Sequence, residues 1–95
     1  MGLFSKQRLG IDLGTANTII YIDNKGIALR EPSIVARNIK TGEVVAYGKE
    51  AAKLVGRTSD TYETIRPIRD GVIADFSLTK QMLAHFIKQA VLRYL

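Results

Sequence analysis

Several residue types are absent or rare in this chain of 95 residues, which has no cysteine, no tryptophan and a single histidine. The absence of cysteine excludes a disulfide framework and a thiolate metal site. One histidine is too few for a histidine-rich metal centre. No apolar run approaches the ~20 residues that cross a bilayer, and residues 1–8 lack the apolar stretch of a signal peptide. We therefore expect a cytoplasmic protein.

Long runs of one charge are also missing. Lys and Arg number 14 against 9 Asp and Glu, which gives a net charge of +5, but the basic residues are spread along the chain. Dispersed positive charge favours a mild attraction to phosphate or anionic lipid over a dedicated nucleic-acid patch, so no nucleic-acid partner is expected. The hydrophobic fraction of 46% and the charged fraction of 24% are typical of a soluble globular chain. The length fits one small domain or part of a larger one.

Two apolar, β-branched runs enclose a turn of small residues near the N-terminus. Residues 9–13 and 19–22 predict the two strands of a hairpin. Asp12 stands at the end of the first strand, where a carboxylate can hold a hydrated Mg²⁺. Gly14 breaks the apolar run, and backbone N–H groups in such a turn can form a nest for phosphate oxygens.

The side chains of the turn have the chemistry of the same site. The hydroxyls of Thr15 and Thr18 and the amide of Asn17 can converge on an anion. The alternative from the residues alone is a plain hairpin with a solvated carboxylate. The predicted nucleotide-binding residues are Asp12, Gly14, Thr15, Ala16, Asn17 and Thr18, with Asp12 near Mg²⁺ through water.

The string at 10–18 resembles the first phosphate-binding motif of the ATPase superfamily of actins, heat-shock chaperones and sugar kinases. Asn17 and its neighbours make it similar to the bacterial actin homologues of the MreB family in particular. Two further strings, at 26–36 and 66–75, resemble the same family. The resemblance extends over essentially the whole chain and matches only the N-terminal part of that family.

The patterns predict an α+β or α/β class, and the resemblance implies a partial actin-like (ribonuclease-H-like) ATPase fold. We expect a mixed sheet that opens with a three-stranded antiparallel meander over 9–29, followed by a smaller strand-and-helix excursion. Apolar residues at three- and four-residue steps then predict a C-terminal amphipathic helix, capped by Asp75 or Ser77. The helix presents a broad apolar face that a short sheet covers only in part.

The resemblance also implies a division of the chain. Residues 1–8 form a tail, 9–36 and 66–95 belong to the inner subdomain of the first lobe, and 37–65 form the small outer subdomain. In the tail, two apolar side chains beside two basic ones could touch an anionic membrane, although such a short segment binds weakly on its own. The alternative is a disordered terminus.

The resemblance implies ATP and Mg²⁺ as ligands and a role in filaments that guide peptidoglycan synthesis and set rod shape. It places such filaments at the inner face of the plasma membrane, with three kinds of partner: further copies of the chain, the membrane surface, and the wall-elongation proteins MreC, MreD and RodZ. The second phosphate loop and the adenosine-binding segment of the family have no counterpart here. We therefore expect the ATPase activity of the full-length family but no activity, and no catalytic residue, in these 95 residues alone.

Two other functions stay open at this point. One is an ATPase of the same superfamily with another task, a chaperone or a sugar kinase. The other is a free-standing small module that binds a partner and no longer handles nucleotide. The final helix also has no stop signal, which predicts that the chain is a truncated piece.

Overall fold

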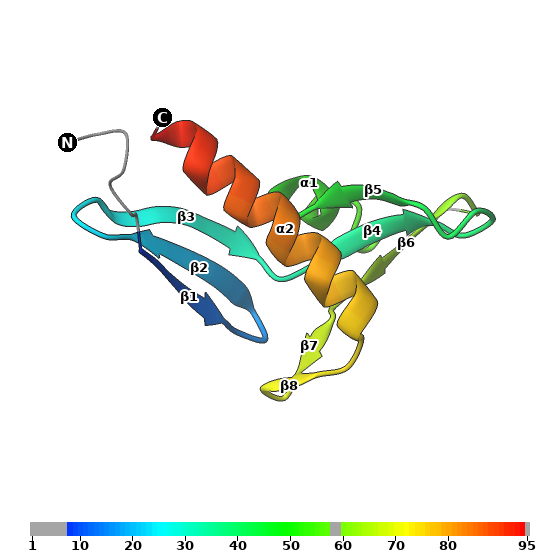
Figure 1. Cartoon of the computed structure of the whole chain (residues 1–95). Coiled ribbons are helices and arrows are strands. Elements are labelled where there is room, and N and C mark those ends of the chain that lie inside the picture. The colour runs from blue at the N-terminus through cyan, green and yellow to red at the C-terminus, as the bar shows by residue number, and fades with distance from the viewer. Residues whose placement is uncertain (1–7, 58–59, 95) are drawn as a thin grey trace.

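The computed structural model describes residues 8–57 and 60–94. Three small sheets follow one another along the chain, and the long helix α2 (Phe76–Arg93) lies across them (Figure 1). Residues 1–7 of the predicted tail at 1–8 lie outside the described residues. None of the described helices is long and apolar enough to cross a membrane.

The first sheet is the predicted meander, with strand order β1 (Leu9–Leu13), β2 (Asn17–Ile22) and β3 (Gly26–Pro32), all antiparallel. Because side chains alternate across a strand, β2 has one buried face and one more open face. Ile20 and Ile22 are buried, whereas Tyr21 is exposed. We call the buried side the inner face and the other side the outer face.

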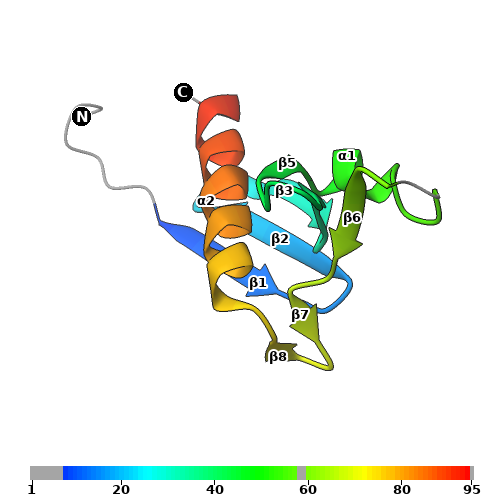
Figure 2. The ribbon, with the colours of Figure 1, turned by 90° about the vertical axis from the view of Figure 1, so that its right-hand side faces the viewer.

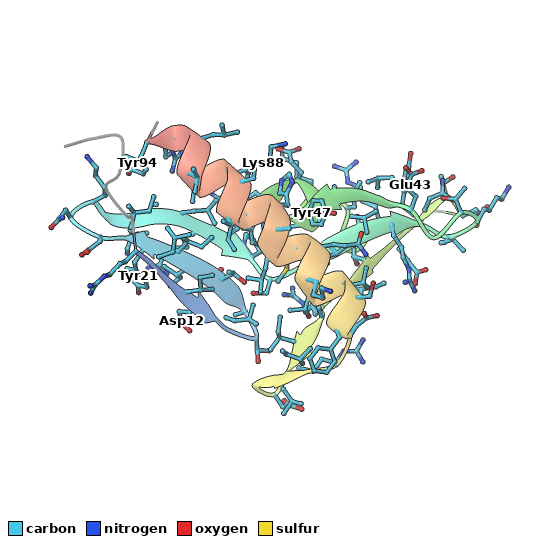
Figure 3. The ribbon with its side chains drawn as sticks, in the orientation of Figure 1. Asp12, Tyr21, Glu43, Tyr47, Lys88 and Tyr94 are labelled. Atoms are coloured by element: carbon cyan, nitrogen blue, oxygen red, sulfur yellow. The ribbon has the colours of Figure 1, made fainter. Side chains whose placement is uncertain are left out.

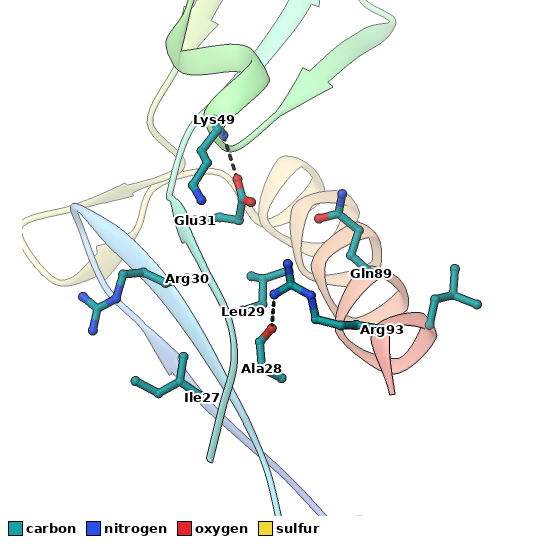
Figure 4. Close-up of a pocket in the computed structure, with 9 residues that line it drawn as sticks. Ile27, Ala28, Leu29, Arg30, Glu31, Lys49, Gln89 and Arg93 are labelled. Atoms are coloured by element: carbon teal, nitrogen blue, oxygen red, sulfur yellow. Dashed lines mark hydrogen bonds between the residues drawn. The ribbon is translucent and has the colours of Figure 1, made fainter. Parts of the chain in front are cut away.

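A β-bulge interrupts the pairing of β2 with β3. The register shifts between Ile20 and Tyr21, whose partners are Leu29 and Ile27, so Ala28 is the extra residue. A bulged residue loses its ladder partner, and here Arg93 replaces that partner. Its Nη1 donates to the Ala28 carbonyl oxygen at 2.8 Å (Figure 4). The end of α2 is thereby tied to the edge of the sheet.

The second sheet has β4 (Val35–Asn38) in the middle, with β5 (Val44–Tyr47) and β6 (Tyr62–Ile65) on either side. The short helix α1 (Lys49–Ala52) follows β5. Its Lys49 N–H donates to the Glu31 carboxylate at 2.7 Å, which joins α1 to the end of β3 (Figure 4). This excursion matches the strand-and-helix segment expected after the meander.

The third sheet is a hairpin of β7 (Ile68–Arg69) and β8 (Val72–Ile73). Its two-residue turn, Asp70–Gly71, has positive φ at both positions, 53° and 75°. Asp-Gly with two left-handed residues is the favoured type I′ hairpin turn, so these two residue types suit the turn that they form.

Helix α2 begins at the predicted cap, since Asp75 Oδ1 accepts from the Leu78 N–H at 2.9 Å. Its apolar stripe packs on the inner face of the first sheet, along one side of the strands (Figure 2). Met82 and Phe86 are fully buried there. The middle of the helix is covered, because strands of both larger sheets contribute to the same core. Phe76 and Leu92 near its two ends stay exposed, which agrees with the expectation of a partly covered helix face.

The fold class is confirmed, with one difference in the sheet. Within the described residues every strand pair is antiparallel and the strands form three sheets, where a single mixed sheet was expected. Parallel pairing needs a long crossover between strands. The one long helix of the chain comes after the last described strand, so no such crossover exists within these residues.

Candidate functional site

The loop between β1 and β2 contains only three residues, Gly14, Thr15 and Ala16, because β2 already begins at Asn17. The turn is closed by the Gly14 N–H, which donates to the Asn17 carbonyl oxygen at 3.0 Å. A Cβ at Gly14 would lie 2.7 Å from that oxygen. Glycine is required here because a larger residue would not fit. Its backbone conformation is not the reason, since Gly14 is not among the residues with positive φ.

Ser33, which follows β3, fixes this loop through two hydrogen bonds. Its N–H donates to the Ala16 carbonyl oxygen at 2.9 Å, and its hydroxyl donates to the Gly14 carbonyl oxygen at 2.7 Å. The Ser33 side chain is fully buried. Sequence reasoning missed this contact, because nothing in the local pattern indicates which distant loop a serine reaches.

Thr18 belongs to the same buried network. Its Oγ1 lies 2.8 Å from Ser33 Oγ. Since the single hydroxyl proton of Ser33 goes to Gly14, Thr18 is the donor in this pair. Thr18 is fully buried on the inner face, so its hydroxyl supports the loop from inside and does not converge on an anion as expected.

Thr15 connects the loop to the hairpin of β7 and β8. Its Oγ1 accepts the Gly71 N–H at 2.8 Å, across 56 residues of sequence. The backbone N–H groups of Thr15 and Ala16 have no acceptor among the described residues. The loop is therefore fixed at both ends and presents two adjacent free donors at its tip, where a nest for an anion was predicted.

Asp12 and Asn17 lie on the exposed outer face beside the loop, and Figure 3 shows Asp12 pointing away from α2. No other side chain pairs with Asp12 in the described part of the chain. The described residues also contain no group of three or more carboxylate or histidine side chains that could hold a metal ion. A cation at Asp12 would need water or phosphate oxygens as its other ligands, which suits Mg²⁺.

A cavity of about 530 Å³ borders the loop at Thr15. Two guanidinium groups, those of Arg66 and Arg69, contribute to its wall, together with Asp70 of the hairpin turn. The segment at 66–75, which resembles the same family in sequence, thus lies beside the predicted phosphate loop. Arg69 Nε also contacts the Arg66 carbonyl oxygen at 3.4 Å, near the limit for a hydrogen bond.

The six predicted binding residues lie on one hairpin, but they serve two purposes. Gly14 and Thr18 shape and support the loop, while Thr15 and Ala16 present free N–H groups and Asp12 and Asn17 lie exposed beside them. The residues present fit a phosphate with a hydrated Mg²⁺, because the donors and the carboxylate are open and unpaired. Their assignment to ATP stays a prediction.

Comparison with known proteins connects this chain to a family. A sequence model described as "MreB/Mbl protein" matches residues 6–94. The cell shape-determining protein Mbl of Bacillus subtilis is 54% identical over 81 residues, which are 85% of this chain and 24% of that protein. The cell shape-determining protein MreB of Escherichia coli is 53% identical over 92 residues, 93% of this chain and 26% of that protein. The chain thus spans about a quarter of the length of these relatives.

Solved structures agree with the sequence matches. MreB5 of Spiroplasma citri bound to ADP superposes with a TM-score of 0.82 at 35% identity, over 94% of this chain and 27% of that chain. The same protein bound to AMPPNP gives a TM-score of 0.79 at 37% identity, over 87% and 25% of the two chains.

Proposed function

This chain belongs to the MreB/Mbl family of actin-like, cell shape-determining proteins, and we propose that it supplies the first phosphate-binding loop of an ATP-binding filament protein. Membership of this family excludes the alternative of a chaperone or a sugar kinase. The relatives' solved structures contain AMPPNP and ADP, which supports a nucleotide as the ligand.

The observation that carries the proposal is the pair of free N–H groups at Thr15 and Ala16. Their loop is held by Ser33 on one side and by Gly71 on the other. A loop fixed before the ligand arrives loses little conformational entropy on binding. Two adjacent amide N–H groups can therefore donate to phosphate oxygens without first breaking a protein hydrogen bond.

Asp12 is proposed to stand near a hydrated Mg²⁺. Bound Mg²⁺ would neutralise phosphate charge and hold the phosphate oxygens in place. The exposed Asp12 carboxylate has no cation of its own in the described residues, so it can orient the water shell of an ion. Asn17, also exposed beside the loop, can donate its amide N–H to an oxygen of the same ligand.

These residues alone give an incomplete site. One loop and one carboxylate bind from a single side, and the phosphates stay partly hydrated, so each hydrogen bond replaces one with water at small net gain. We expect ATP affinity in the millimolar range, about −4 kcal/mol, and no useful hydrolysis. A general acid, a base or a water-positioning group is not proposed for any residue of this chain.

The wider role is proposed from the family. It comprises ATP-dependent, membrane-associated filaments at the inner face of the plasma membrane, with wall-elongation proteins such as MreC, MreD and RodZ as partners. Residues 9–36 with 66–95, and 37–65, are proposed as parts of an inner and an outer subdomain. Ala51 of the proposed outer subdomain is buried against Ile34 and Ala36, which stand next to the proposed boundary, in a small cluster apart from the main core.

The competing function is a small module that binds a partner and does not handle nucleotide. The observation in its favour is the incomplete site, in which the described residues offer a ligand one loop and its neighbouring side chains on a single side. Nucleotide titration separates the two functions.

The test is an NMR titration of the 95-residue chain with ATP, with and without Mg²⁺, together with a phosphate-release assay. We expect the amide signals of Thr15 and Ala16 to shift at millimolar ATP, and Asp12→Asn to reduce the effect of Mg²⁺. Lys40→Gln, which removes an exposed charge in the turn between β4 and β5, is the control and should change nothing. Unmoved Thr15 and Ala16 signals would contradict the proposed loop, and steady phosphate release would contradict the incomplete site.

A further inference from the structure

Glu31, near the end of β3, lies where three elements of the chain meet. Its carboxylate oxygen Oε1 accepts the Lys49 N–H at 2.7 Å, at the start of α1 (Figure 4). Among residues 8–57 and 60–94 the carboxylate makes no ion pair, so its contact with α1 does not compete with a cation. A hydrogen bond to a charged acceptor is stronger than one between neutral groups. Glu31 therefore fixes the start of α1 to the first sheet.

Gly48 provides the room for this carboxylate. A Cβ at Gly48 would collide with the Glu31 carboxylate and would lie 3.0 Å from Cε1 of Phe86 in α2. Phe86 is fully buried, so its ring has no space to move aside. Gly48 also has φ 61° and ψ −131°, a backbone conformation that residues with a side chain rarely adopt. The position of the carboxylate is therefore set from two sides, by a glycine and by a buried ring.

The segment that continues from Glu31 has few free torsions. Pro32 follows, and its ring fixes its own φ. The Ile34 N–H donates to the Pro32 carbonyl oxygen at 2.9 Å, which makes a γ-turn centred on Ser33. The Ile34 carbonyl oxygen accepts the Gly48 N–H, also at 2.9 Å. A shift of Glu31 is therefore hardly absorbed before it reaches Ser33.

Ser33 connects the same segment to the phosphate loop. It lies two residues after Glu31, about 7 Å along an extended chain. Its N–H donates to Ala16 and its hydroxyl donates to Gly14. One short segment thus fixes α1 through Glu31 and the loop between β1 and β2 through Ser33.

We propose that Glu31 is a positioning residue that couples the phosphate loop to α1 and the second sheet. This coupling rests on the proposed function, since it requires that the loop between β1 and β2 binds phosphate. A phosphate on the free N–H groups of that loop stiffens it. The stiffer loop stabilises the Ser33 contacts and, two residues earlier, the hydrogen bond from Lys49 to Glu31. Because coupling between two sites is reciprocal, the Glu31 contact in turn strengthens phosphate binding.

The coupling needs two states of the Glu31 contact. In the closed state the carboxylate accepts from Lys49, and in the open state both groups bind water. Glu31 is only partly buried, so water reaches its carboxylate and the exchange of partners has a small net cost. We therefore expect a coupling at the low end of the usual range, about fivefold in affinity.

The experiment is an NMR titration of the 95-residue chain with ATP and Mg²⁺ at constant ionic strength, read at two pairs of amides. One pair is Thr15 and Ala16 in the loop, and the other is Gly48 and Lys49 at the start of α1. In the wild type both pairs should shift along one binding curve. In Glu31→Ala the loop pair should still shift, at about fivefold higher ATP, while the second pair no longer responds. Glu31→Gln keeps an acceptor oxygen and should restore most of the coupling.

Variants at Lys49 test the same hydrogen bond from its donor side. Lys49→Pro removes the N–H and leaves Glu31 in place, and proline is tolerated at the first position of a helix. It should behave as Glu31→Ala does when read at Gly48, and the double variant E31A/K49P should be no weaker than either single variant. Lys49→Gln keeps the N–H and removes the charge, so it is the matched control and should behave as wild type. Glu43→Ala removes an exposed carboxylate before β5 and should also change nothing.

The outcomes separate this coupling from the proposed function. Wild-type loop signals that shift while Gly48 and Lys49 stay unchanged would overturn the coupling and leave the phosphate loop intact. Loop signals that do not move would overturn both. A Glu31→Ala variant that responds like the wild type would overturn the role of Glu31. Circular dichroism checks the fold of each variant, and if Glu31→Ala did not fold, the comparison of Lys49→Pro with Lys49→Gln would decide.

Discussion

At the scale of residues, Ser33 is the group on which the predicted phosphate loop depends. It makes three hydrogen bonds, to Ala16, Gly14 and Thr18. Small residues in a loop allow a ligand to approach, but they do not fix the loop. Buried polar contacts fix it, because a buried group that loses its partner is costly.

Replacing Ser33 should therefore destabilise the chain more than replacing Thr18. Ser33→Ala leaves the Gly14 carbonyl and the buried Thr18 hydroxyl without their partner, which should cost about 2–3 kcal/mol. Thr18→Val removes one hydroxyl and leaves the Ser33–Gly14 bond in place, at about 1 kcal/mol. Urea denaturation followed by circular dichroism measures both. Equal losses would show that the hydroxyl chain is not organised as described.

Gly14→Ala should cost about 1–3 kcal/mol, the usual range for overpacking, because the added Cβ would lie 2.7 Å from the Asn17 carbonyl oxygen. Gly10→Ala is the matched control in the same strand region. Its Cβ would meet only Tyr21, at an ordinary 3.7 Å, so its stability should stay close to wild type. The same denaturation experiment compares them, and a Gly14→Ala variant as stable as Gly10→Ala would contradict the steric argument.

At the scale of elements, the apolar sequence pattern of α2 agrees with the way in which the helix packs on the sheets. Its apolar stripe faces the inner side of the first sheet, and Tyr47 of β5 stacks on His85 with ring centroids 4.3 Å apart. At its far end, Arg93 satisfies the carbonyl of the bulged Ala28. The helix therefore contacts two sheets. Its Arg93 also supplies a hydrogen-bond donor at the β-bulge, where the pairing of β2 with β3 is interrupted.

The N-cap residue of α2, Asp75, can be tested by substitution. Asp75→Ala should lower stability by about 1 kcal/mol, because the Leu78 N–H loses its acceptor at 2.9 Å. Asp75→Asn keeps an acceptor and should recover most of the loss. Ser77→Ala, whose hydroxyl makes only a 3.4 Å contact with Gln81, is the control and should change little. Thermal melts of the three variants decide whether Asp75 or Ser77 acts as the cap.

At the scale of the whole molecule, the chain is extended. Its radius of gyration is 14.6 Å, above the ~12.4 Å expected for a compact domain of this length. The two larger sheets and α2 share a main core around Ile20, Met82 and Phe86, and a small cluster at Ile34, Ala36 and Ala51 lies apart from it. A long shape leaves much surface exposed, which makes a small chain marginally stable.

This division should appear in amide hydrogen exchange. Local stability follows the amount of apolar contact, so we expect slow exchange at Ile20 and Met82 and faster exchange at Ala51 and in β5. Exchange measured by NMR on the wild-type chain gives a protection value for each amide. Uniform protection across both clusters would show a single cooperative unit instead.

The sequence by itself determined the local structure, because local structure depends on short-range sterics and periodicity. Alternating apolar residues specified the meander, Asp70 and Gly71 specified the type I′ turn, and Asp75 with its apolar stripe specified α2. The motif at 10–18 also indicated the family by its resemblance to the family's first phosphate-binding motif, and the family is confirmed. Only the tertiary structure decided which groups of that motif are free. Thr18 and Thr15 are both hydroxyl residues of the same turn, yet one is buried against Ser33 and the other accepts from Gly71. Those contacts join segments that are 15 and 56 residues apart, and such distances in sequence are set by how the strands and hairpins pack together.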